Sequence, residues 1–341
     1  VPYYLDNLSA GEAYDVTVIE ADTVLNQVER DLLFAAGLDN NLNEIDGQGL
    51  FEKGTYEMGR ATKGAAMAML ARVYLYREKW ERAKELAQMV MDIGIYDLEE
   101  DYGANWDNLD ENGKESIFEL QFKANQPFAD RSWGMNVGNW IHSFTATPSF
   151  DPGPGGWSII IPAEHVPDLH ESGDQRRKIN VFVQGDKYPF APEGKQDYFP
   201  NQHTGTNMAK YIIRNHYSQP EQPDYLDSDL NMPIIRFAEV LMIYAEASYE
   251  LGQVDVAFEY LNRIRSRAGL EAISNSDGDF KEALVKERRI EFFGEGHRYF
   301  DLRRWGMALD TLNPLGFREK DLYLPYPQEE MDVNPGLLNS L

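Results

Sequence analysis

The sequence predicts an all-α fold, in which paired helices form a scaffold and a loop-rich lobe is inserted between its two helical parts. Three observations lead to this prediction: an internal helical repeat, further helical segments outside the repeat, and a proline-rich middle without helical periodicity. At 341 residues the chain is long enough to bury a large core, as one domain or two.

A helical hairpin occurs twice in the chain at one constant offset. Leu70-Ala71, Tyr74, Ala83, Ala87 and Val90 of the first copy correspond to Tyr244-Ala245, Ser248, Ala257, Leu261 and Ile264 of the second. Each copy places a small residue where two helices approach and apolar residues on one helical face. Any antiparallel helical hairpin would favour alanine at its closest approach. The duplication, with the leucine, small residue and tyrosine of the first helix, favours a tetratricopeptide (TPR) repeat.

Two more helices are expected outside the repeat. One runs from about Glu12 to Phe34 and the other from Phe280 to Phe293. The second has a clear start, because Asp279 followed by Glu282 resembles a capping box. The scaffold is therefore predicted to be helical near both ends of the chain.

The middle of the chain is predicted to be a loop-rich lobe. Eleven prolines lie between Asn125 and Asn231, and helical periodicity fades there. Clusters of β-branched and aromatic residues predict short strands at Ser116–Phe122, Trp157–Ile161 and Ile179–Val183. We expect three parts: residues 1–124 as TPR-type helical scaffold, 125–232 as the ligand-binding lobe, and 233–341 as C-terminal TPR-type helices.

Aromatic side chains in this lobe are the candidates for ligand binding. The C–H face of a sugar ring packs on an aromatic plane, while nearby amides bond its hydroxyl groups. The same aromatics could instead fill a small core beneath the loops. Trp157, which precedes an isoleucine run, fits that second interpretation better than Trp133 or Trp140 does. The predicted ligand-binding residues are Trp133, Trp140, Asn136, Asn139, Tyr198 and Trp157.

Composition and motifs argue against several other functions. The net charge of −25 would repel phosphate backbones, and the Lys and Arg residues form no basic stripe. Cysteine is absent from the sequence, no apolar run is long enough to span a bilayer, and the six histidines show no metal-ligand spacing. The motifs of serine hydrolases, P-loop proteins, zinc proteases and dinucleotide-binding enzymes are also absent. We therefore expect no catalytic residues, no cofactor and no metal.

The segment from Glu287 to Trp305 is dense in charged and aromatic residues. Charge partners spaced i, i+3 and i, i+4 predict a structural network that ties two helices together, with Trp305 packed against them. The residues assigned to this structural role are Arg288, Arg289, Glu291, Glu295, Arg298, Asp301 and Trp305.

The same segment, read as R-R-x-E-x-x-x-E-G-x-R-x-x-D-L-R-R-W from Arg288 to Trp305, resembles the C-terminal signature of the SusD/RagB family of surface nutrient-binding lipoproteins. Other blocks agree in order, including Gly173-Asp174-Gln175-Arg176 as the G-D-x-R turn and Ile235–Leu241 before the second TPR helix pair. Val1-Pro2 resembles a point well inside the family pattern, so the family's N-terminal helices, signal peptide and lipidated cysteine are expected to lie outside this sequence.

The resemblance implies a SusD-like lid over a SusC-like, TonB-dependent outer-membrane transporter. Such a protein holds oligosaccharide on the extracellular face of the outer membrane, anchored by a lipid, and carries out no catalysis. RagB-like capture of peptides is the alternative, because an acidic chain suits cationic peptides. A helical glycoside hydrolase is the third reading and requires two carboxylates in a cleft.

Overall fold

The structure is a computed structural model that describes residues 4, 7–13, 17–55, 57–107, 111–123, 138–146, 156–187, 204–212 and 228–334. It divides into two compact units, one of residues 50–298 and one of residues 1–49 with 299–341.

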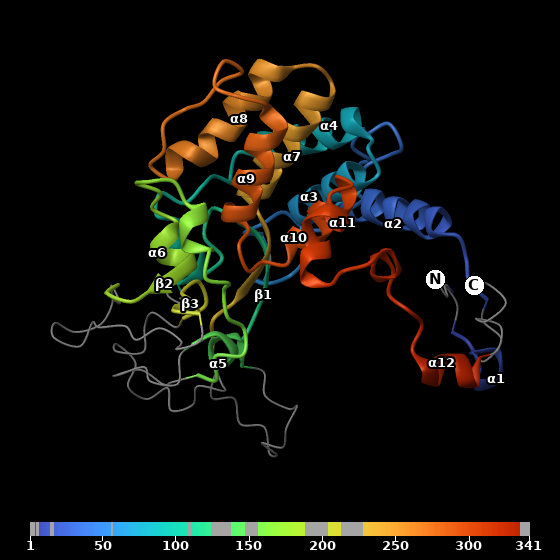
Figure 1. Ribbon diagram of the computed structural model, residues 1–341. Helices are drawn as coiled ribbons and strands as arrows, with labels where there is room; N and C mark the ends of the chain where they lie inside the picture. Colours follow the sequence, from blue (N-terminus) through green and yellow to red (C-terminus); the bar gives the residue numbers. More distant parts are fainter. Residues whose placement is uncertain are drawn as a thin grey trace. The chain divides into compact units, whose positions relative to one another are not determined.

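Two helix pairs form the core of the larger unit (Figure 1). They are α3 (Lys63–Tyr76) with α4 (Trp80–Asp92), and α7 (Phe237–Glu250) with α8 (Val254–Arg267). Within each pair the helices pack together, and α4 packs on α7. The repeat positions Ala71, Ala83, Ala245 and Ala257 have no exposed surface, because the helices meet there. The TPR-type scaffold and the all-α class predicted from the sequence are confirmed.

The predicted helix near Phe280 is also confirmed. It is α9 (Phe280–Glu291), and the side chain of Asp279 caps it by accepting hydrogen bonds from the backbone N–H groups of Lys281 and Glu282. Phe280 is 1% exposed and its ring stacks on Tyr249, 4.8 Å between centroids. This contact fastens the start of α9 to the end of α7.

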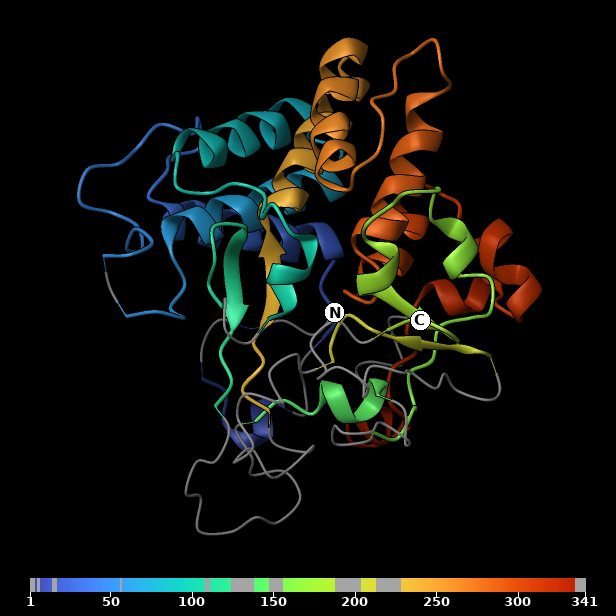
Figure 2. The same cartoon turned by 90° about the vertical axis from the view of Figure 1, so that its left-hand side faces the viewer.

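Short strands form two antiparallel pairs in the larger unit (Figure 2). The strand β1 (Ser116–Leu120) pairs antiparallel with β4 (Met232–Arg236), and β2 (Val181–Val183) pairs antiparallel with β3 (Thr206–Met208). Figures 1 and 2 show α7 and α8 at one end of this unit and α5 (Ile141–Thr145) at the other, with both strand pairs between them.

The sequence predictions for these strands are only partly right. The strand at 116–122 is confirmed, whereas the one at 179–183 begins later, since α6 (Arg177–Asn180) occupies its first residues. The strand predicted at Trp157–Ile161 is wrong, because this segment bonds to the end of α5 instead of to another strand. Two short 3₁₀ helices, η1 (Tyr102–Trp106) and η2 (Pro167–Leu169), complete the larger unit.

The smaller unit holds α1 (Ala10–Ala13), α2 (Ala21–Ala36), α11 (Ala308–Leu312), η3 (Asn313–Leu315), η4 (Glu319–Leu322) and α12 (Gln328–Val333). Most of α10 (His297–Arg304) also belongs to it. The prediction of a single helix from Glu12 to Phe34 was wrong, since residues 17–20 are not helical. Thr17, Val18 and Ile19 are β-branched and favour extended backbone there. Gly37 ends α2 with φ +71°, and a Cβ at this position would lie 2.6 Å from the Gln48 carbonyl oxygen.

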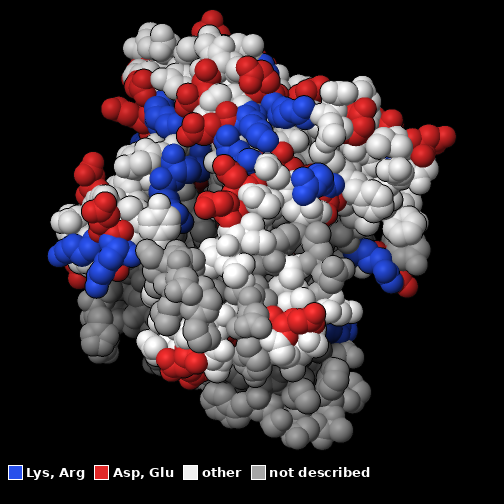
Figure 3. Space-filling model, turned by 90° about the vertical axis from the view of Figure 1, so that its right-hand side faces the viewer, with Lys and Arg blue, Asp and Glu red and all other residues white. Residues whose placement is uncertain are grey.

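The surface carries charge of both signs. On the face shown in Figure 3, Lys and Arg side chains are interleaved with Asp and Glu side chains and form no continuous basic stripe. No helix in the described ranges is both long and apolar enough to cross a membrane. The same ranges contain no group of three His, Asp or Glu side chains that could hold a metal ion.

Candidate functional site

The segment 156–160 closes the C-terminal end of α5. Three backbone N–H groups of this segment donate hydrogen bonds to backbone carbonyls at the end of α5. The donor–acceptor pairs are Trp157 to Ser143 (2.6 Å), Ser158 to Ala146 (3.0 Å) and Ile159 to Phe144 (2.8 Å). These bonds satisfy carbonyl groups that a helix end leaves without an intrahelical partner. They also fix the backbone from which the Trp157 side chain projects.

Gly156 permits this close approach. A Cβ at position 156 would lie 2.6 Å from the carbonyl oxygen of Ala146 and 2.8 Å from that of Ser143. Backbone atoms cannot move aside as the end of a flexible side chain can. Glycine at this position is therefore part of what places Trp157 beside α5.

Three aromatic rings meet where the segment 156–160 packs against α5. The ring centroids of Trp140 and Trp157 are 6.5 Å apart at 81°, and those of Phe144 and Trp157 are 5.6 Å apart at 58°. We call Trp140, Phe144 and Trp157 the aromatic platform. Trp157 is 36% exposed, and the neighbouring Ile159 is 63% exposed. A partly solvent-facing cluster of this kind can pack against the apolar face of a ligand.

The platform is supported from beneath by β3. Asn207 is fully buried, and its side-chain amide donates to the carbonyl of Thr145 (3.2 Å) and to the hydroxyl of Ser158 (2.9 Å). It therefore joins both segments that carry the platform. The roles of Phe144 and Asn207 were not predicted, since the sequence does not show that 141–146, 156–160 and 206–208 lie together.

The structure brings together part of the predicted ligand-binding set. Trp140 and Trp157 lie side by side. Asn139 is 3% exposed, where its amide nitrogen donates to the Leu230 carbonyl and its amide oxygen accepts from the Ile141 N–H. Through these two hydrogen bonds Asn139 fixes the start of α5. The other three predicted residues, Trp133, Asn136 and Tyr198, lie outside the described residues.

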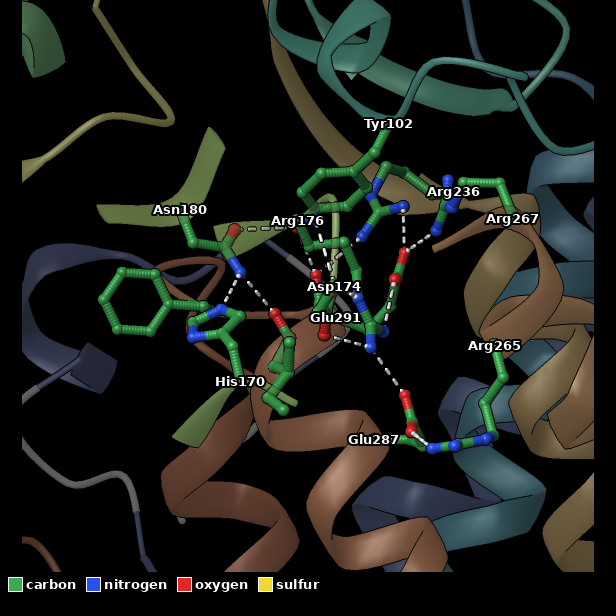
Figure 4. A network of polar contacts seen from close by, with 12 residues as sticks. Tyr102, His170, Asp174, Arg176, Asn180, Arg236, Arg265, Arg267, Glu287 and Glu291 are labelled. Atoms are coloured by element: carbon green, nitrogen blue, oxygen red, sulfur yellow. Dashed lines mark hydrogen bonds and ion pairs between the residues drawn. The ribbon is translucent and has the colours of Figure 1, made fainter. Parts of the chain in front are cut away.

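Arg176 inserts its guanidinium among carboxylates from two parts of the chain (Figure 4). It is fully buried and pairs with Asp174 in its own turn at 2.8 Å. It also pairs with Glu287 at 2.8 Å and Glu291 at 3.3 Å, both on α9. This arrangement attaches the G-D-x-R turn of the lobe to the helical scaffold.

Glu291 is the centre of this network. Besides Arg176, it accepts from Arg236 at the end of β4 (3.0 Å) and Arg267 at the end of α8 (2.5 Å). Burial opposes ionisation, but Arg267, Arg236 and Arg176 outweigh it and hold the pKa of the Glu291 carboxyl well below its usual range. Arg236 and Arg267 also both pair with Glu115 before β1. One ionised carboxylate thus joins residues from four parts of the chain.

Most ion pairs of these residues do not follow the helical spacing expected from the sequence. Asp301 and Arg304 form an ion pair with the expected i, i+3 spacing. Glu291 instead pairs with arginines that are 24, 55 and 115 residues away in the sequence. Glu295 likewise pairs with Arg236 and with Lys210.

The other signature residues have separate positions. Arg288 is buried, with its guanidinium 4.9 Å from the Phe292 ring. Arg289 and Arg298 are half-buried and line one cavity beside α9. Trp305 is half-buried with the guanidinium of Arg304 4.5 Å from its ring.

Comparison with known sequences decides the family. The profile of the SusD family matches residues 34–319. The chain belongs to the SusD family. A SusD-like protein of Formosa agariphila is 26% identical over 99% of this chain, and a second one from the same organism is 27% identical over 81%.

Solved structures of SusD proteins agree with this assignment. A structure described as a laminarin binding SusD-like protein is 28% identical and covers 98% of this chain and 72% of its own, with a TM-score of 0.79. Surface glycan-binding protein A from Bacteroides fluxus is also 28% identical, covering 98% and 70%, with a TM-score of 0.75. This chain spans 67% and 58% of the lengths of the two Formosa relatives.

Replacing Arg176 with methionine should lower the free energy of unfolding by about 3 to 5 kcal/mol, because it leaves buried carboxylates without their cation. Urea unfolding followed by circular dichroism measures the change. Arg60→Met is the control, since Arg60 forms an exposed i, i+3 pair with Glu57 and its loss should cost no more than about 0.5 kcal/mol. Equal stability of the two variants would contradict the role given to Arg176.

Gly156→Ala should push the 156–160 segment away from α5. We expect a loss of about 1 to 3 kcal/mol in stability from the steric overlap, together with a weaker near-ultraviolet circular dichroism signal from the Trp140–Trp157 pair. Gly11→Ala is the matched control, because a Cβ at Gly11 meets nothing within 4 Å. If both measurements on Gly156→Ala equal those of the wild type, the close approach does not position Trp157.

Proposed function

We propose that this protein binds oligosaccharide at the outer face of the outer membrane and delivers it to a SusC-like TonB-dependent transporter, without catalysis. Membership of the SusD family supports this, as do two solved relatives whose descriptions name laminarin binding and surface glycan binding. The observation that carries the proposal for this chain is the aromatic platform. Its rings come from a lobe anchored to a rigid scaffold.

The platform fits capture without chemistry. A sugar ring laid on an exposed indole buries its C–H face while its hydroxyl groups remain hydrated at the rim. Binding of this kind does not require a closed, dry active site. In the proposal, Trp140 and Trp157 contact the glycan. Three further predicted contacts lie outside the described residues: Trp133, Asn136 and Tyr198.

The electrostatics of the buried carboxylates support a non-catalytic role. A glycosidase needs one carboxylic acid kept protonated near neutral pH. Burial would raise the pKa values of Glu291 and Glu295, but arginines hold the pKa of Glu291 low, and Arg236 with Lys210 holds that of Glu295 low. Burial does raise the pKa of Glu111 to about 7. However, the Glu111 carboxylate accepts a hydrogen bond from the Asn231 backbone, a structural use.

Peptide capture is the second candidate, and the net charge of −25 favours it for cationic peptides. A partly exposed aromatic platform can also pack against apolar peptide side chains. The two candidates differ in the ligand that saturates the site and in how binding depends on salt. Attraction of a cationic peptide should weaken as ionic strength rises, whereas stacking of a neutral glycan should not.

The test is a titration of the protein with laminarin and with short cationic peptides, using isothermal calorimetry. Trp140→Ala and Trp157→Ala should each weaken glycan binding about ten-fold or more, as expected for loss of a large aromatic contact. Trp80→Ala, the same change at a half-buried position on α4 outside the platform, should bind as the wild type does.

Three results would count against the proposal. Laminarin bound equally well by both platform variants would remove the platform from the site. Saturable binding of peptides alone would favour the second candidate. Shortened oligosaccharides detected by mass spectrometry after incubation would contradict the absence of catalysis.

A further inference from the structure

A cavity of about 480 Å³ lies between α9 and the segment that contains η2. On its α9 wall, Glu282, Lys286 and Arg289 follow the spacing i, i+4, i+7 and share one helical face. Asp168 and Glu171 lie on the opposite wall. The volume falls within the range of ordinary small-molecule sites, and no residue of the aromatic platform lines it.

Arg289 lines this cavity and has no counter-ion among the described residues. Its Nη2 donates to His165 Nε2 at 3.1 Å, and no described carboxylate lies within ion-pair distance. Half-burial without such a partner lowers the pKa of its guanidinium. A guanidinium presents a planar fork of N–H donors that matches a carboxylate.

Glu171 lines the same cavity but forms no ion pair with Arg289, because other cations already hold its carboxylate. Glu171 accepts from Arg265 at 2.8 Å and from Lys286 at 2.9 Å. Hydrogen bonds from Arg265 and then Lys286 outweigh burial and keep the pKa of Glu171 at about 2. The Glu171 carboxylate is therefore paired on both sides.

One wall of the cavity is preformed by neutral contacts. His170 Nδ1 donates to the Val166 carbonyl at 3.2 Å, and its Nε2 accepts from the Asn180 side chain at 3.2 Å (Figure 4). Burial lowers the pKa of His170, so the ring stays neutral. The η2 segment is thereby tied to Asn180 of α6, whose side chain also donates to the Ile290 carbonyl on α9 at 2.9 Å.

The remaining acidic groups narrow the class of ligand. Asp168 and Glu282 are exposed at the cavity and offer hydrogen-bond acceptors. A ligand with hydroxyl groups can donate hydrogen bonds to these carboxylates, whereas an inorganic anion without hydroxyl groups cannot. Leu169 and Val285 add apolar surface suited to C–H groups. A ligand with one carboxylate, several hydroxyls and a compact ring satisfies all of these groups at once.

We propose that this cavity binds a uronic acid unit of a saccharide, with Arg289 pairing to its carboxylate and with Asp168 and Glu282 accepting from its hydroxyl groups. The inference rests on the proposed function, because it names the class of glycan that the protein holds at a second position. It assigns the signature residue Arg289 a role in ligand contact.

The test is a calorimetric titration with glucuronate, with glucose and inorganic sulfate as comparison probes. Glucuronate should bind saturably, and each comparison probe should bind at least ten-fold more weakly. Arg289→Gln should weaken glucuronate binding about ten-fold or more, as expected for a hydrogen bond between charged groups. Arg60→Gln, at an exposed arginine outside the cavity, should leave it unchanged. Should Arg289→Gln fold poorly, Val285→Trp, which fills the cavity without changing its charge, should give the same loss.

Absence of saturable glucuronate binding would overturn the inference. So would binding that survives both Arg289→Gln and Val285→Trp, or sulfate binding as tight as that of glucuronate. Platform variants separate this inference from the proposed function. Loss of laminarin binding in Trp157→Ala with unchanged glucuronate binding supports two distinct sites. Loss of both ligands in Trp157→Ala contradicts the second site.

Discussion

The buried carboxylate of Glu291 is the constraint on which the rest of the larger unit depends. Three arginines, from the G-D-x-R turn, the end of β4 and the end of α8, converge on it. An ionised group removed from water is tolerated only where such partners satisfy it. Each of these segments must therefore reach its native position before the network is complete. Because loss of any one partner leaves buried charge uncompensated, the network specifies one arrangement of lobe and scaffold.

This constraint explains how the described segments 138–146, 156–187 and 204–212, which carry only short strands, short helices and turns, can hold the aromatic platform in one position. The lobe contributes short strands and single turns, which by themselves bury little apolar surface. Ion pairs fix its Asp174–Arg176 turn to α9, and Asn207 on β3 fixes the end of α5 to the segment 156–160. The aromatic rings are then held in place at little further conformational cost when a ligand binds. Rigid support and a shallow site suit a protein that captures a ligand and passes it on unchanged.

The sequence was sufficient to predict what depends on local periodicity. The TPR pairs were predicted because Ala71 and Ala245 recur in the same helical context, and α9 because Asp279 marks its start. Long-range features were not predictable. Nothing in the spacing of Glu291 shows that its partners lie up to 115 residues away. The run at 157–161 has strand-forming residues, yet its N–H groups bond to α5, a tertiary contact that overrides local preference. Charge spacing predicted a structural role for the signature residues. In the structure Glu291 lies in a buried ion-pair network, whereas Arg289 lies outside that network and lines a cavity beside α9.

The central claim, that a scaffold-supported aromatic platform holds the glycan, is tested most directly by hydrogen–deuterium exchange with and without saturating laminarin. The account predicts slower exchange on binding at residues 141–146 and 157–160, because ligand covers the turn that carries the platform. It predicts no change in α4 and α7, whose amides are already protected within the scaffold. Protection that appears in the TPR helices while residues 141–146 and 157–160 exchange as before would contradict the claim.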